Sequence, residues 1–187
     1  IFYDDNFFNH RRHLTAILEA MIEEKLTVPW AAIGRVNGID RETAALARRA
    51  GCYRMEFGIE SGSPRILDRI KKQITVAQIE TAHHGVVEAG IIFRPYLIVG
   101  SPGENWDTLD ETARLLLRMR IEPDNFLSNV MWLLPGTPIF HEWAAADPAV
   151  ATIWERTDET VYYTAEHSLE ELRRFRNYLL FHMPEGF

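Results

Sequence analysis

The chain has 187 residues, 47% of them hydrophobic, which is enough to bury one substantial core within a single domain. Its formal net charge of -7 at pH 7 argues against a protein that mainly coats nucleic acid or an anionic membrane. No apolar run reaches the roughly 20 residues that span a bilayer, so we expect a cytoplasmic protein without a transmembrane segment.

Strands and helices are expected to alternate along residues 1–143. Five apolar or alternating runs predict strands, at residues 1–3, 28–36, 53–60, 91–100 and 126–134. Runs with helical periodicity separate them. Capping residues predict where the helices begin. These are Asp40, Ser63 before Pro64, Thr75 with Gln78, Thr108 with Glu111, and Thr137 before Pro138.

This alternation predicts right-handed crossovers, a parallel sheet and helices packed outside it. We therefore expect an α/β fold, an incomplete TIM-like (βα) partial barrel with five parallel strands and outer helices, over residues 1–143. Residues 144–167 lack a clear period, and Ser168 with Glu171 predicts the start of a final helix. Residues 144–187 are therefore expected to form a C-terminal helical extension.

Polar and glycine-bearing segments follow four of the predicted strands. Parallel α/β folds place their active sites at the carboxyl ends of the strands, so we expect these segments to surround one pocket that holds a small molecule. Their carboxylates could bind an ammonium group, a ribose diol or a metal. The segments are Asp4-Asp5-Asn6, Glu60-Ser61-Gly62, Gly100-Ser101-Pro102-Gly103-Glu104 and Pro135-Gly136-Thr137.

In this order and spacing, the segments resemble those of radical S-adenosylmethionine (SAM) enzymes. The resemblance extends over about residues 1 to 140. It is closest to cobalamin-dependent members such as the anaerobic magnesium-protoporphyrin monomethyl ester cyclases. It implies an enzyme that reductively cleaves SAM to a 5′-deoxyadenosyl radical, for oxidation, cyclisation or methylation of an organic substrate. A tetrapyrrole substrate follows only by analogy with those cyclases.

The resemblance also implies a set of cofactor-binding residues. The methionyl amino group of SAM would lie at Asp4-Asp5-Asn6, and the ribose or methionine moiety at Glu60-Ser61. The adenine would lie beside Ile98 and Gly100 and against the backbone of Leu134-Pro135-Gly136.

Two weaker candidates are Arg35 and Glu104. Arg35 is close to the end of a predicted strand and could contact a carboxylate of the cofactor or substrate. Glu104 resembles the glutamate of the family's Gly-x-Ile-x-Gly-x-x-Glu pattern but stands one residue late, and Tyr96 replaces the first glycine.

The single cysteine, Cys52, excludes a cysteine-rich metal site built from this chain alone. Radical SAM enzymes carry a Cys-x-x-x-Cys-x-x-Cys loop whose thiolates hold a 4Fe-4S cluster. We therefore expect that the chain begins after that loop, inside a larger protein, and that the isolated piece is inactive. The resemblance implies SAM and the cluster as cofactors, an electron donor such as flavodoxin or ferredoxin, and cobalamin if an upstream domain binds it.

Other interpretations of the same residues stay open. Asp4, Asp5 and Glu60 could bind Mg²⁺ in a barrel hydrolase or lyase, or an acidic face could bind a partner in a non-catalytic module. Locally, residues 4–6 could be an ordinary strand-to-helix turn, and Glu60 could pair with an arginine such as Arg35 or Arg54.

Overall fold

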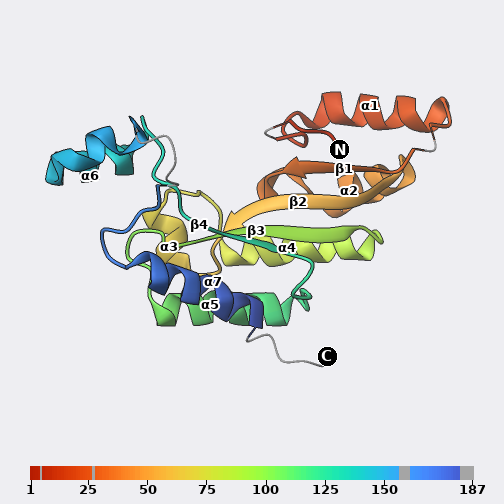
Figure 1. The fold of residues 1–187 in the computed structure, drawn as a ribbon. Helices are drawn as coiled ribbons and strands as arrows, with labels where there is room; N and C mark the ends of the chain where they lie inside the picture. Colours follow the sequence, from red (N-terminus) through yellow and green to blue (C-terminus); the bar gives the residue numbers. More distant parts are fainter. Residues whose placement is uncertain (5, 27, 156–160, 182–187) are drawn as a thin grey trace.

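Four parallel strands form one sheet, and they lie side by side in chain order (Figure 1). The strands are β1 (Trp30–Gly34), β2 (Cys52–Glu60), β3 (Ile92–Val99) and β4 (Leu127–Val130). The structure is a computed structural model and describes residues 1–4, 6–26, 28–155 and 161–181. Every neighbouring pair of strands is parallel and consecutive, so helical crossovers connect them, as the sequence predicts.

One helix precedes β1, and the others occupy the connections between the strands. They are α1 (Arg11–Glu23), η1 (Val36–Gly38), α2 (Arg41–Arg49), α3 (Pro64–Arg69), α4 (Val76–Glu88) and α5 (Trp106–Arg118). Helix α2 packs on β2 and α4 packs on β3, behind the sheet in the view of Figure 1. Apolar side chains of these helices and of alternate strand residues form the main core.

The opposite face of the sheet is less covered, and we call it the inner face. In β3, Phe93, Pro95, Leu97 and Val99 are buried, whereas the residues between them are partly exposed. Parallel register aligns Glu56 with Arg94 and Gly58 with Tyr96, so these residues share the inner face. The inner face of β2 and β3 carries Arg54, Glu56, Gly58, Arg94, Tyr96 and Ile98.

The expectation of five strands is wrong in number. The segment at residues 1–3 makes one isolated parallel bridge, between Phe2 and Ala32, in which the Phe2 N–H donates to Ala31 at 2.8 Å. A turn follows, and the Phe7 N–H donates to the Ile33 carbonyl in β1 at 3.0 Å. The Phe2 ring instead stacks on Phe7, with ring centroids 4.6 Å apart.

The last strand is shorter than predicted because the chain leaves the sheet after Val130. Trp132 forms an antiparallel bridge with Tyr162, flanked by hydrogen bonds that join Met131 to Tyr163 and Leu133 to Val161, each at 3.0 Å. Beyond it lie α6 (Pro138–Ala146) and η2 (Pro148–Glu155), which stand apart from α1 in Figure 1. They enclose a small second core of Leu133, Phe140, Val150 and Val161.

The final helix, α7 (Leu169–Phe181), packs against α5 and β4. Its side chains of Leu172, Phe175 and Leu179 are buried in the main core. The predicted cap is confirmed, since the Ser168 N–H donates to Glu171 and the Glu171 N–H donates to Ser168. The division into a barrel at 1–143 and an extension at 144–187 stays a prediction.

Most predicted helix starts are confirmed. Asp40 and Thr137 cap α2 and α6 with their side chains, and Thr75 forms a capping box with Gln78. The prediction for α5 is wrong by three residues. Its cap is Asn105, whose side chain accepts the N–H of Thr108, and Thr108 occupies the third helical position.

Candidate functional site

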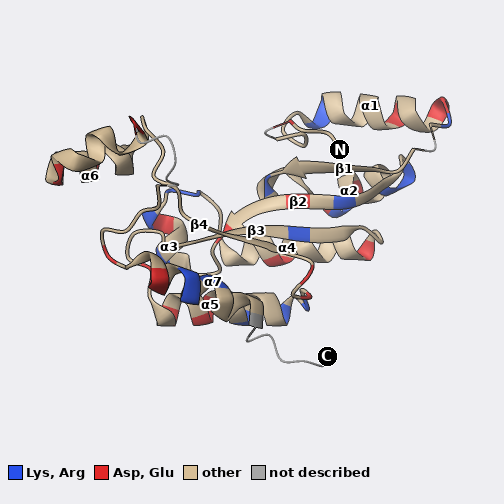
Figure 2. Ribbon diagram, viewed as in Figure 1, with Lys and Arg blue, Asp and Glu red and all other residues tan. Residues whose placement is uncertain are grey.

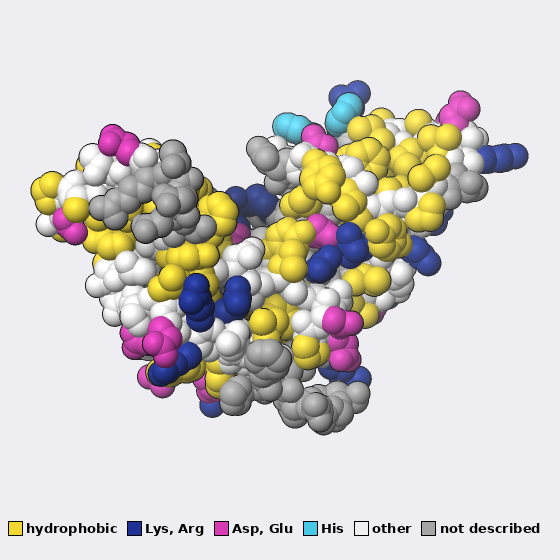
Figure 3. Space-filling model, viewed as in Figure 1, with side chains coloured by type: hydrophobic (Ala, Val, Ile, Leu, Met, Phe, Trp, Pro, Cys, Tyr) yellow, Lys and Arg dark blue, Asp and Glu magenta, His cyan; other side chains and the backbone are white. Residues whose placement is uncertain are grey.

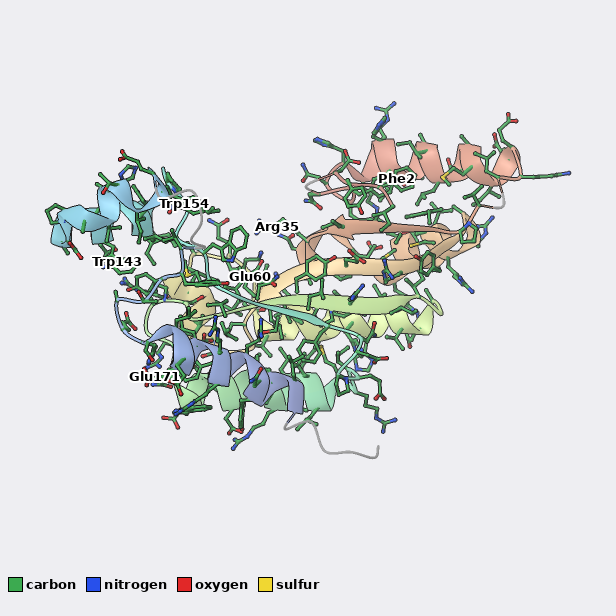
Figure 4. All side chains as sticks on the ribbon, viewed as in Figure 1. Phe2, Arg35, Glu60, Trp143, Trp154 and Glu171 are labelled. Carbon is green, nitrogen blue, oxygen red and sulfur yellow. The ribbon has the colours of Figure 1, made fainter. Side chains whose placement is uncertain are left out.

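The carboxyl ends of β1 and β2 are joined by a chain of hydrogen bonds. The Asn6 side-chain oxygen accepts the backbone N–H of Arg35 at 3.2 Å. The Arg35 guanidinium donates to the carbonyl of Lys72 at 2.9 Å, and the Lys72 ammonium pairs with Glu60 at 2.6 Å. The structure thus brings Asn6, Arg35 and Glu60 together, and Figure 4 shows Arg35 and Glu60 at the same end of the sheet.

Glu60 has an unusual backbone conformation. Its φ is 66°, in the left-handed region that costs a residue with a Cβ roughly 1–2 kcal/mol. The side chain folds back over Gly58, where an added Cβ would lie 2.5 Å from the Glu60 carboxylate. Strain of this kind persists where the surrounding structure enforces it, and it is common at functional sites.

Lys72 is a site residue that the sequence analysis missed. It follows α3, and its side chain is 19% exposed, beside a Glu60 side chain that is 16% exposed. Glu60 therefore pairs with Lys72 rather than with Arg35 or Arg54. Two opposite charges that remain partly open to solvent can bind the ammonium and carboxylate of an amino acid.

The Ser61 hydroxyl points into the protein rather than toward this pair. It lies 3.2 Å from the hydroxyl of Thr112 on α5 and accepts the N–H of Ser63 at 3.1 Å. The Gly62 N–H donates to the same threonine at 2.9 Å. The Ser61 side chain is therefore engaged in holding the turn that follows Glu60.

The segment from Gly100 to Asn105, which we call the β3–α5 loop, is closed by its own glutamate. The Glu104 carboxylate accepts the N–H of Gly100, and the residue is 2% exposed. Burial raises the pKa of Glu104 to about 7. The Glu104 side chain thus shapes the loop, while Ile98 is partly exposed on the inner face.

Two residues that precede α7 form hydrogen bonds with the backbone of the β3–α5 loop. The Gly103 N–H donates to Glu166 at 2.7 Å, and the His167 ring lies 2.8 Å from the Glu104 carbonyl. Leu172 packs so closely on Gly100 that an added Cβ would lie 2.7 Å from it. The C-terminal part of the chain therefore fixes the position of Gly100.

The predicted adenine-binding segment lies between β4 and α6. Leu134 is 47% exposed, and its carbonyl accepts the Thr137 hydroxyl at 2.7 Å. Gly136 has a φ of 83°, and no atom beyond its chain neighbours lies within 4 Å of where a Cβ would stand. Figure 3 shows the molecule hollowed between α6 and the part formed by α1 and β1.

A cavity of about 260 Å³ lies beside the candidate site, and none of its lining residues is a predicted cofactor-binding residue. Its walls come from the turn before Lys72, the β3–α5 loop, the end of β4 and α6. The lining residues are Arg69, Ile70, Lys71, Pro102, Met131, Pro138, Ile139 and Glu142. Asp4 is exposed in the segment before α1, and Asp5 lies outside the described residues.

Comparison with known proteins identifies the family. Residues 3–116 match the model of the radical SAM superfamily. The chain belongs to this superfamily. The predicted resemblance is thereby confirmed, and the alternatives of a metal-dependent hydrolase or lyase and of a protein-binding module are not favoured.

Sequence relatives include one methyltransferase and two cyclases by name. The chain is 29% identical over 180 residues to an uncharacterized methyltransferase of Pyrococcus horikoshii, covering 92% of this chain and 39% of that protein. It is 31% identical over 137 residues to the anaerobic magnesium-protoporphyrin IX monomethyl ester cyclase of Cereibacter sphaeroides, covering 71% of this chain and 22% of the cyclase. The chain thus spans well under half the length of these relatives.

Solved structures of radical SAM enzymes share the fold. The radical SAM methyltransferase TsrM from Kitasatospora setae, solved with cobalamin and a [4Fe-4S] cluster bound, aligns with a TM-score of 0.67 and 19% identity, over 76% of this chain and 29% of TsrM. Coproporphyrinogen III oxidase from Escherichia coli aligns with a TM-score of 0.56 and 13% identity, over 73% of this chain and 37% of the oxidase. The partial-barrel fold class is confirmed.

The radical SAM cluster does not fit the residues of this chain. Cys52 is fully buried at the start of β2, the end of the strand opposite Glu60, and burial raises the pKa of its thiol to about 12. Thiolates are the cluster ligands, so this cysteine is not one of them. Within residues 1–4, 6–26, 28–155 and 161–181, no group of three or more His, Cys, Asp or Glu could hold a metal ion. Nor does that part of the chain contain a helix able to cross a membrane.

Proposed function

We propose that this chain is the SAM-binding part of a larger radical SAM enzyme, and that Glu60 and Lys72 bind the methionyl end of the cofactor. The 2.6 Å ion pair between them carries the proposal. The methionyl group ends in an ammonium and a carboxylate, so each charge finds an opposite partner at this pair. Both side chains are partly buried, which strengthens charge-assisted hydrogen bonds relative to water.

The residues around Glu60 and Lys72 support binding of the methionyl end at this pair. Arg35 donates to the carbonyl of Lys72 and thereby positions that lysine. The lack of a side chain at Gly58 makes room for the ion pair itself, because an added Cβ would lie 2.5 Å from the Glu60 carboxylate and 3.2 Å from the Lys72 ammonium. The remaining predicted contacts, at Ile98, Gly100 and Leu134 to Gly136, would lie along the nucleoside. Bound SAM supplies radical chemistry to such a site, and the residues of this chain orient it and exclude water.

The reaction of the whole protein is part of the proposal. The names of the relatives favour methylation or cyclisation of an organic substrate, with a tetrapyrrole as one candidate and cobalamin as a further cofactor. Reductive cleavage of SAM needs an electron donor, for which we propose a flavodoxin or ferredoxin in the cytoplasm. The cluster ligands would come from outside this chain.

Calorimetric titration with S-adenosylhomocysteine tests the site. We expect Glu60→Gln and Lys72→Met each to weaken binding at least tenfold, while Arg118→Gln, an exposed change on α5, leaves it unchanged. 5′-Methylthioadenosine, which lacks the amino acid part, should bind all four proteins alike. Absence of binding to the unchanged chain, or equal binding by the Glu60 and Lys72 variants, would overturn the proposal.

A further inference from the structure

A second charged cluster lies on the inner face, away from the Glu60–Lys72 pair. Glu56 is at its centre, with a side chain only 4% exposed. It pairs with the Arg54 guanidinium at 2.7 Å and accepts the hydroxyl hydrogen of Tyr96. Arg94, its neighbour across the sheet, approaches the same carboxylate only to 3.8 Å.

The charges of this cluster do not balance. One carboxylate faces two guanidinium groups, and Arg54 and Tyr96 already contact it closely. The Nε atoms of Arg54 and Arg94 are both buried, and neither donates a hydrogen bond of good geometry to any residue that the structure describes. They differ in distance, since the Arg54 Nε lies 2.7 Å from the Glu56 carboxylate and the Arg94 guanidinium only 3.8 Å from it. A buried donor without an acceptor costs free energy, more so when it is charged. The cluster therefore has room for a second anion, at Arg94.

The charged cluster lies on the same face of the sheet as the proposed cofactor site. Glu56 and Gly58 point to the same side of β2, and a strand rises about 3.3 Å per residue, so they are roughly 7 Å apart along it. The register shifts between Gly58 and Glu60, and the Glu60 carboxylate reaches this side by folding back over Gly58. Figure 2 marks basic residues on both β2 and β3 beside an acidic residue of β2. In Figure 3, basic and acidic side chains over these strands are bordered by hydrophobic ones.

Apolar side chains surround the cluster on the inner face. Ile33 aligns with Glu56 on one side, and Leu127 aligns with Tyr96 on the other. Leu127 is 40% exposed, and Ile98 lies next along β3. A ligand on this surface would thus bury an apolar body while its anionic group reaches Arg94.

We propose that Arg94, assisted by Arg54, binds a carboxylate of the substrate. This proposal rests on the proposed function, because it takes the end of the sheet near Glu60 as the place of chemistry. The substrate is then an anionic organic molecule with an apolar body.

Nuclear magnetic resonance titration with 4-phenylbutyrate tests the proposal, and 4-phenylbutyramide serves as the neutral probe of the same shape. We expect the acid to cause a saturable shift of the arginine Nε–H signals and the amide to cause none. Arg94→Gln should weaken binding of the acid at least fivefold, and Arg118→Gln should not. Equal responses to acid and amide, or equal binding by Arg94→Gln, would overturn the proposal.

Two controls keep the outcome decisive. If Arg94→Gln fails to fold by circular dichroism, Arg94→Lys replaces it; that variant keeps the charge and should still prefer the acid over the amide. Loss of that preference in a folded Arg94→Lys would also count against the proposal. Titration of the same samples with S-adenosylhomocysteine separates the two sites. Failure of the nucleoside to bind contradicts the proposed function, whereas intact nucleoside binding without acid preference contradicts only the substrate site.

Discussion

The carboxylate of Glu104 accepts the backbone N–H of Gly100, four residues earlier, so the loop after β3 carries its own internal acceptor. The acid is almost completely buried, and its backbone carbonyl lies 2.8 Å from the His167 ring. An ionisable group in this position makes the stability of the loop dependent on pH. Its neighbour Gly100 is a predicted adenine contact, so that dependence concerns the candidate site directly.

Glu104→Gln should flatten the dependence of stability on pH. Burial raises the pKa of Glu104 from 4.5 to about 7, so the folded state holds the proton more tightly than the unfolded chain does. This contribution is full below pH 4.5 and is lost as pH rises through 7. A shift of this size corresponds to about 3 kcal/mol. Urea unfolding at pH 5 and pH 8 measures it, and Glu111→Gln, an exposed change, should follow the unchanged chain.

Gly100→Ala should destabilise the protein for two reasons, namely backbone strain at a positive φ and a clash with Leu172. The φ of Gly100 is 87°, and the new Cβ would lie 2.7 Å from Leu172. We expect a loss of about 2 kcal/mol or more in the free energy of unfolding. Gly136→Ala is the matched control, because its φ is 83° but its surroundings are open. It should cost only about 1 kcal/mol.

Leu172→Ala tests the contact from the other side. This leucine is fully buried, so truncation alone should cost about 2–5 kcal/mol. Combined with Gly100→Ala it also makes room for the new methyl group. Denaturant unfolding of the double variant should therefore show a loss about 1 kcal/mol smaller than the sum of the single losses. Strict additivity would mean that the two residues do not contact one another.

Glu60→Gly should be more stable than Glu60→Ala. Both changes remove the ion pair with Lys72, but only glycine adopts a φ of 66° without strain, a difference of about 1 kcal/mol. Thermal unfolding measures the order. At Glu80, inside helix α4, the same pair of substitutions should give the reverse order, because glycine is unfavourable in a helix. Both Glu60 variants should bind S-adenosylhomocysteine weakly.

Asn105→Ala should destabilise α5 by about 1 kcal/mol, the usual value for a lost helix cap. Its side-chain oxygen accepts the N–H groups of Asp107 and Thr108, each at 3.1 Å. Glu111→Ala should change the free energy of unfolding by less than about 0.5 kcal/mol. If Glu111→Ala destabilised the protein more than Asn105→Ala in urea unfolding, Thr108 rather than Asn105 would be the cap of α5.

The sequence predicted those features that depend on neighbouring residues. The capping pairs Thr75 with Gln78 and Ser168 with Glu171 are local, and the structure contains both. The predicted cap Thr108 was wrong because Thr108 has capping-box spacing both to Asn105 before it and to Glu111 after it. Periodicity alone does not distinguish these two frames, which differ by nearly one helical turn.

The features that were missed depend on contacts between distant residues. Lys72 stands between Lys71 and Gln73 with no helical or strand pattern, and only the fold brings it to Glu60. The run through Leu134 is apolar enough for a strand, but Met131 and Leu133 pair with residues 161 and 163, whose sequence shows no period. The superfamily and its fold class were nevertheless predictable, because the order of short motifs carries that information.

The contact between Leu172 and Gly100 has a practical meaning for dissecting this protein. The stretch recognisable as radical SAM ends at residue 116, yet a side chain more than fifty positions later rests on the loop that the cofactor would touch. Expression clones that stop at residue 116 would therefore lack Leu172. Any loss of ligand affinity in them would reflect the lost packing on Gly100 and not the loss of a residue that contacts the ligand.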